Sequence, residues 1–110
     1  LLIHVLFNLF KNAIYFIRKA GKGNIHIWLE HHPRHNQIHF KDTGAGIKSE
    51  NLPKIFDPFF TVDTNKGTGI GLAFCAMTLK SFGGSITCQS EWQEYTEFIL
   101  TFPRKPTQQE

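Results

Sequence analysis

The amino-acid sequence predicts an α/β (α+β) two-layer sandwich, in which helices cover one face of a mixed, mainly antiparallel sheet. Two segments carry apolar residues at helical spacing, and four shorter segments have the alternation and composition typical of strands. These segments follow one another in the order helix, hairpin, long connection, helix, hairpin. With 110 residues, of which 41% are apolar, we expect one domain with a packed core.

The first expected element is an amphipathic helix over residues 1 to about 20. Its apolar residues recur at spacings of three and four, and a glycine-containing segment, residues 21–24, ends the pattern. The apolar positions are Leu2, Leu6, Leu9, Ala13 and Ile17. Because the first residue is not methionine and already belongs to this pattern, we expect the chain to be a fragment of a longer protein.

Residues 25–30 and 38–42 alternate between apolar and polar side chains, and the segment between them contains Pro33 and other turn-forming residues. This pattern predicts an antiparallel hairpin with one buried face. Asp42 has the same parity as Ile38 and Phe40, so its carboxylate is expected to point toward the helix layer. A buried carboxylate there would need a hydrogen-bond donor.

Residues 47–66 are expected to form a long, weakly structured connection with a short helical piece near residues 49–55. A connection of this length in a small domain is usually functional. A second helix should run from about residue 69 to residue 82 and end at Gly83-Gly84. Its expected inward positions are Leu72, Ala73, Ala76 and Leu79.

Residues 85–90 and 96–102 predict a second hairpin, with its turn across residues 91–95. The expected domain comprises residues 1–103. Residues 104–110 are polar and contain a proline, which is typical of a linker or tail.

Two glycine-rich runs, residues 42–46 and 67–72, look like two walls of one nucleotide site. The first run places a carboxylate at a strand end, followed by glycines that allow a ligand to approach the backbone. The second leads into the second helix, where backbone N–H groups can bind phosphate oxygens. The runs lack the strand-then-GxGxxG order of a Rossmann fingerprint and the Gly-Lys-Ser/Thr of a Walker loop.

Asn8 and Asn12 are four residues apart, so their amides lie on one face of the first helix. An amide oxygen can complete the octahedral shell of Mg²⁺ beside phosphate oxygens and waters. The alternative is a pair of surface asparagines with no ligand.

Together these residues resemble the catalytic and ATP-binding domain of sensor histidine kinases, in the superfamily shared with gyrase, Hsp90 and MutL. Residues 8–13, 42–46, 56–60 and 67–72 are similar to the N-box, first glycine box, F-box and second glycine box of that family. The boxes occur in the family's order and cover residues 1 to about 90. Residues 5–19 resemble the quorum-sensing members. The resemblance implies a Bergerat-type ATP-binding fold.

The resemblance also implies residue roles. Asn12 would be the Mg²⁺ ligand and the catalytic residue, Asn8 a supporting polar contact, and Asp42 the acceptor of the adenine amino group. The other nucleotide contacts that it implies are Phe16, Gly44, Gly46, Ile47, Thr68, Gly69, Gly71 and Leu72. For Phe16, plain core packing is the alternative.

Two positions depart from the family pattern. Tyr15 and Asp63 stand where relatives often carry lysine. Phosphate charge would then be met by Mg²⁺, by backbone donors and by Lys66 or Lys11, although Lys66 could equally be a solvated residue. We expect the connection to be disordered without nucleotide, with Gly67 as one hinge.

The most informative departure from the wider superfamily is Asn8. Gyrase, Hsp90 and MutL carry a glutamate at this position, where it activates water, and an amide cannot accept a proton at neutral pH. We therefore expect the domain to hold ATP without rapid hydrolysis and to transfer the γ-phosphate to a histidine. In the family that histidine lies on a separate dimerisation hairpin, and a response regulator or receiver domain follows in the relay. The alternatives are a gyrase-like or MutL-like ATPase and a nucleotide-binding pseudokinase.

Composition limits the other partners. The net charge of +3 is spread along the chain apart from Arg18, Lys19 and Lys22, so we expect no nucleic-acid partner. No apolar run approaches the ~20 residues of a membrane span, and we expect a cytoplasmic domain of an inner-membrane sensor.

Cys75 and Cys88 lie in apolar stretches and are expected to be buried free thiols. A zinc site at His31, His32 and His35 is disfavoured, because no cysteine or carboxylate set completes the shell.

Overall fold

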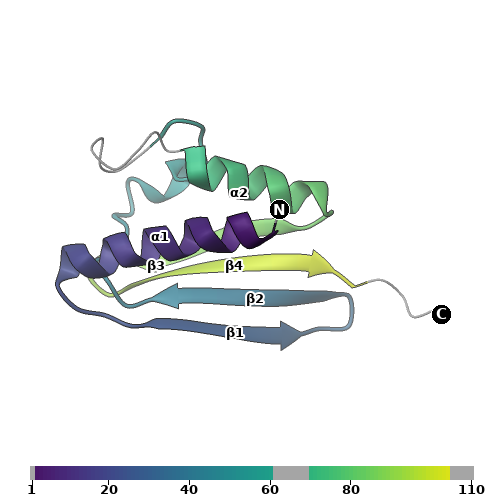
Figure 1. Cartoon of the computed structure of the whole chain (residues 1–110), viewed down its shortest axis with the longest axis horizontal. Helices are drawn as coiled ribbons and strands as arrows, with labels where there is room; N and C mark the ends of the chain where they lie inside the picture. Colours follow the sequence, from purple (N-terminus) through teal and green to yellow (C-terminus); the bar gives the residue numbers. More distant parts are fainter. Residues whose placement is uncertain (1, 61–69, 105–110) are drawn as a thin grey trace.

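The computed structural model describes residues 2–60 and 70–104 and contains two layers (Figure 1). The elements are α1 (Leu2–Ala20), β1 (Ile25–His31), β2 (His35–Asp42), a 3-10 helix (Leu52–Lys54), α2 (Ile70–Ser81), β3 (Ser85–Glu91) and β4 (Tyr95–Pro103). The strands form one sheet in the order β1-β2-β4-β3, and α1 and α2 lie side by side on one of its faces. The predicted fold class is therefore confirmed, and each pair of neighbouring strands is antiparallel.

The core lies between α1 and the two central strands. Helix α1 buries Val5, Leu9, Ala13 and Phe16, at spacings of four and three, against residues of β2 and β4. The expected positions Leu2, Leu6 and Ile17 are only half-buried. Helix α2 covers the flank of α1 that carries Val5, whose carbonyl oxygen lies 3.9 Å from the Cys75 sulfur. The most buried line of α1 is therefore the one that faces both the sheet and α2.

In α2, the expected positions Ala73 and Leu79 are buried, while Leu72 and Ala76 are half-buried. Cys75 and Thr78 are buried as well, because this face of the helix meets α1 and the sheet. Cys75 and Cys88 are both free thiols, and Cys88 is half-buried. Within residues 2–60 and 70–104, neither helix combines the length and the apolar character needed to cross a membrane.

Both hairpins are longer than the sequence pattern predicts. The first turn comprises residues 32–34, because the ladder continues to the pair His31 and Asn36. The second turn comprises residues 92–94. The alternation of apolar side chains ends before the ladder does, since backbone hydrogen bonds do not require apolar residues. The short helical piece expected near residues 49–55 is a single 3-10 turn, Leu52–Lys54.

Candidate functional site

Asp42, at the end of β2, lies beneath the helix layer with only 2% of its surface exposed. The inward direction expected from its parity is therefore confirmed. Its Oδ1 accepts a hydrogen bond from the Gly44 amide at 2.9 Å, which is the single hydrogen bond that the described part of the chain gives this carboxyl. Burial raises the pKa of Asp42 from 3.8 to about 6, and the Gly44 bond opposes the rise. Within the described residues, its second carboxylate oxygen accepts no hydrogen bond.

The loop after Asp42 packs closely against the last turns of α1. A Cβ at Gly44 would lie 2.5 Å from the Phe16 carbonyl carbon, so only glycine allows this approach. The neighbouring Ala45 amide donates to the Phe16 carbonyl oxygen at 3.0 Å. The Phe16 side chain is 6% exposed and belongs to the core, as the packing alternative expects. Phe16 therefore holds the first glycine box through its backbone.

The other side of this loop meets the turn between β3 and β4. Gly46 has a left-handed backbone with φ of 75°, and a Cβ there would overlap the carbonyl oxygen of Glu91. Ile47 is buried, and its amide donates to the Ser90 hydroxyl at 2.8 Å. The first glycine box is thus fixed between α1 and the hairpin end.

Asn8 and Asn12 are half-buried on one face of α1. The Asn8 side-chain oxygen lies 3.1 Å from the point that a Cβ would occupy at Gly71, in the first turn of α2. The Asn8 side-chain nitrogen donates to the His4 carbonyl at 3.1 Å. Asn12 lies one turn further along, and among the described residues its amide has no hydrogen-bond partner. Asn8 of the N-box and Gly71 of the second glycine box are therefore neighbours, although 63 residues separate them.

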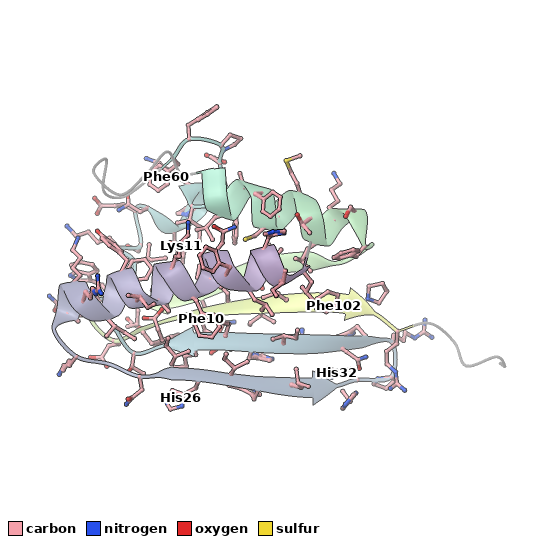
Figure 2. All side chains as sticks on the ribbon, in the orientation of Figure 1. Phe10, Lys11, His26, His32, Phe60 and Phe102 are labelled. Atoms are coloured by element: carbon pink, nitrogen blue, oxygen red, sulfur yellow. The ribbon has the colours of Figure 1, made fainter. Side chains whose placement is uncertain are left out.

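The structure describes only some of the expected site residues that are charged or lie near the connection between residues 47 and 66. Lys11 is exposed on α1, with its ammonium 5.3 Å from the centre of the Phe7 ring, and Figure 2 shows it projecting on the side where α2 lies. Tyr15 accepts a hydrogen bond from Lys19 at 3.4 Å. Leu72 packs half-buried against the core. Lys66, Thr68 and Gly69 of the expected site, together with Asp63 and Gly67, lie outside the described residues.

The histidines near the first turn make local contacts. His32 and His35 stack with ring centres 4.5 Å apart, and His32 pairs with Glu30 at 3.0 Å. Within the described ranges, no group of three His, Cys, Asp or Glu side chains is arranged to hold a metal ion.

The geometry joins a buried aspartate, a glycine loop on α1 and an asparagine pair beside the start of α2. Residues 1–106 match the family model described as histidine kinase-, DNA gyrase B- and HSP90-like ATPase. The chain belongs to this family. Membership in this ATPase family makes the chain an ATP-binding domain.

Relatives within the family are sensor kinases. The chain is 42% identical over 104 residues to the CAI-1 autoinducer sensor kinase/phosphatase CqsS of Vibrio cholerae, covering 94% of this chain. It is also 42% identical over 102 residues to the autoinducer 1 sensor kinase/phosphatase LuxN of Vibrio campbellii, covering 93% of this chain. The chain spans 15% of CqsS and 12% of LuxN. The expected resemblance to sensor histidine kinases is therefore confirmed.

Solved structures agree with this assignment. The catalytic domain of histidine kinase ThkA, in a nucleotide-free form, superposes with a TM-score of 0.77 at 34% identity. The match covers 93% of this chain and 66% of that domain.

Sequence reasoning missed the residues that hold the first glycine box from the hairpin side. Ser90 and Gln93 reach this loop only through the fold, and Ser90 is 43 residues from Ile47. The Tyr95 carbonyl supports Ser90 from within the hairpin. Gln93 has a left-handed φ of 68° in a tight turn, which the residue type glutamine does not predict.

Proposed function

We propose that this chain is the catalytic domain of a two-component sensor histidine kinase, and that it transfers the γ-phosphate of Mg-ATP to a histidine on a separate helical hairpin of the same protein. The observation that carries the proposal is the amide of Asn8. Both of its polar atoms lie against protein groups, the oxygen beside Gly71 and the nitrogen on the His4 carbonyl. An amide held in this way offers no base to activate water.

Adenine recognition falls to Asp42. Its buried carboxyl keeps one oxygen on the Gly44 amide, and the other would accept from the adenine amino group. Gly44 and Gly46 let the adjoining loop pack closely between α1 and the hairpin end. Ile47 supplies a buried apolar wall. In a site of this kind the polar groups fix orientation and the apolar wall contributes burial.

Phosphate binding would combine the start of α2 with a metal ion. Asn12 fits Mg²⁺, because its half-buried amide has no hydrogen-bond partner within residues 2–60 and 70–104 and amide oxygens are ligands that Mg²⁺ accepts. Bound Mg²⁺ would neutralise phosphate charge during transfer. The further residues proposed to contact the nucleotide are Thr68, Gly69, Gly71, Leu72 and Lys66, with Lys11 as a second candidate cation.

The partners follow from the same chemistry. A domain that holds ATP without a base needs an acceptor, so we infer a dimerisation and histidine-phosphotransfer hairpin and, downstream, a response regulator or receiver domain. We also infer a cytoplasmic position within an inner-membrane sensor, because ATP and receiver domains are supplied there. The support is the naming of relatives as autoinducer sensor kinases.

ATP turnover by the chain alone tests this proposal against its two alternatives. We expect Mg-dependent ATP binding with no steady release of inorganic phosphate. Asn8→Glu is the informative variant, since it restores the carboxylate of the hydrolytic relatives, and Asn8→Gln is its uncharged control. Steady phosphate release by the parent chain would favour the gyrase-like or MutL-like ATPase. ATP that is bound, but is neither hydrolysed nor transferred to a supplied histidine-bearing hairpin, would favour the nucleotide-binding pseudokinase.

A further inference from the structure

The end of the β3–β4 hairpin holds the loop of the first glycine box through two hydrogen bonds, and a third bond fixes Ser90 within the hairpin. The Gln93 amide donates to the Ala45 carbonyl at 2.6 Å. The Ile47 amide donates to the Ser90 hydroxyl oxygen at 2.8 Å, and the same hydroxyl donates to the Tyr95 carbonyl at 2.7 Å. Ser90 therefore joins the loop to β4 through a single oxygen atom.

The Ser90 hydroxyl both accepts and donates a hydrogen bond. It accepts from the loop and donates to the hairpin, and the Thr96 hydroxyl lies 3.3 Å away. Ile47 itself is buried, so its amide would lose its acceptor if the hydroxyl were removed. Leaving a buried N–H group without an acceptor destabilises the fold by more than the net stabilisation that one hydrogen bond provides. The loop would then move to find another acceptor.

In its present position the loop is packed closely on both sides. Gly46 sits against the Glu91 carbonyl, where any Cβ would overlap it. On its far side, Gly44 lies equally close to the Phe16 backbone. Asp42 is tied into this arrangement because it pairs with Thr96 in the β2–β4 ladder and because its carboxyl is bonded to Gly44. A displaced loop would therefore change the donor that orients Asp42.

We propose that Ser90 is a positioning residue of the nucleotide site, which acts through Ile47 and the first glycine box on the adenine end of the ligand. The proposal rests on the nucleotide site described above. Ser90 does not touch the nucleotide in this role. It keeps the loop in its bound shape before the ligand arrives, so that binding does not have to order the loop.

Nucleotide titration by calorimetry tests the role of the hydroxyl. We expect Ser90→Ala to lower the affinity for ATP and for ADP by about tenfold each. The ratio of the two affinities should not change, because the loop contacts the adenine end and not the γ-phosphate. Ser90→Thr keeps the hydroxyl and should bind within about threefold of the parent chain. Ser85→Ala, an exposed serine at the start of the same strand, is the matched control and should bind like the parent.

Amide hydrogen exchange tests the proposal without nucleotide. In Ser90→Ala, exchange at Ile47 should accelerate by about tenfold or more, while exchange at Leu100 in the core of β4 should stay unchanged. Parent-like nucleotide affinity in Ser90→Ala, or a Ser90→Thr chain as weak as Ser90→Ala, would overturn the positioning role. Unchanged exchange at Ile47 would overturn it as well. If the parent chain binds no nucleotide but Ile47 responds as expected, the proposed function fails and the loop contact stands.

Discussion

The side-chain oxygen of Asn8 on α1 lies 3.1 Å from the point that a Cβ would occupy at Gly71 on α2. This proximity brings Asn8 of the N-box next to Gly71 of the second glycine box, as the proposed nucleotide site requires. It also explains why glycine stands inside the first turn of a helix, where alanine would favour helix formation by about 1 kcal/mol.

Gly71→Ala should therefore separate stability from function. We expect the free energy of unfolding to stay within about 1 kcal/mol of the parent value, because the higher helix propensity of alanine offsets the crowding of its Cβ against Asn8. Mg-ATP affinity should fall by about three- to tenfold, because the Asn8 amide must move. Calorimetric titration and thermal melting measure the two quantities.

A double-mutant cycle checks the cause. If Asn8 transmits the effect, Asn8→Ala and Gly71→Ala should combine to less than the sum of their separate losses of binding free energy. Full additivity would show that Gly71 acts on the nucleotide independently of Asn8.

Asp42→Asn should abolish detectable binding at micromolar nucleotide, a loss of about 100-fold, and leave the fold intact. The carboxylate would be replaced by a group that can present an N–H to the adenine amino group, and a hydrogen bond to a charged acceptor is lost. Glu50→Gln, at an exposed position outside the four boxes, is the matched control. ATP affinity unchanged by Asp42→Asn would remove Asp42 from the site.

The same substitution should change the pH dependence of stability. The pKa of Asp42 is about 6 in the folded chain against 3.8 as its ordinary value, so the folded state holds an extra proton between these values. The contribution of this group to stability is then present at low pH, is lost as pH rises from about 4 to 6, and stays lost above pH 6. Asp42→Asn should stabilise the nucleotide-free chain by about 1 to 2 kcal/mol at pH 7.5, with solvent screening included, and by little at pH 4.

Urea unfolding of both chains at the two pH values measures this difference. An equal effect of the substitution at pH 4 and pH 7.5 would mean that the buried charge is not its cause.

Gly44→Ala should damage fold and site together. The added Cβ would meet three backbone atoms of residues 16 and 17 at 2.5 to 2.7 Å, and backbone cannot move aside as a side chain can. We expect a loss of about 2 to 3 kcal/mol in the free energy of unfolding. Gly21→Ala is the control, because a Cβ at Gly21 would have no atom within 4 Å. Only its left-handed φ of 77° opposes alanine, so we expect a loss of about 1 kcal/mol in the free energy of unfolding.

Much of this fold follows from local rules. The inward position of Asp42 needed only the period of two in a strand, since Phe40 fixes the parity. The end of α1 needed only the glycines after Ala20. These features depend on neighbours in sequence, so a sequence pattern is sufficient to find them.

Other features depend on contacts between distant segments. His39 has the parity of the open sheet face, yet it is 7% exposed because Trp28 stacks on its ring at 4.8 Å and Glu97 bonds its Nδ1 at 2.7 Å. The contact of Ser90 with the first glycine box is equally invisible in the sequence pattern. Such contacts arise from the order of strands in the sheet, which alternation does not determine.

The most direct test of the account follows the γ-phosphate itself. The chain, radiolabelled ATP and Mg²⁺ are mixed with the histidine-bearing hairpin of its natural protein, and label on the hairpin is compared with label in free phosphate. We expect label on the hairpin, none on a hairpin whose acceptor histidine is replaced by alanine, and none with the Asp42→Asn chain. Free phosphate released at the same rate with and without the hairpin, and an unlabelled hairpin, would contradict it.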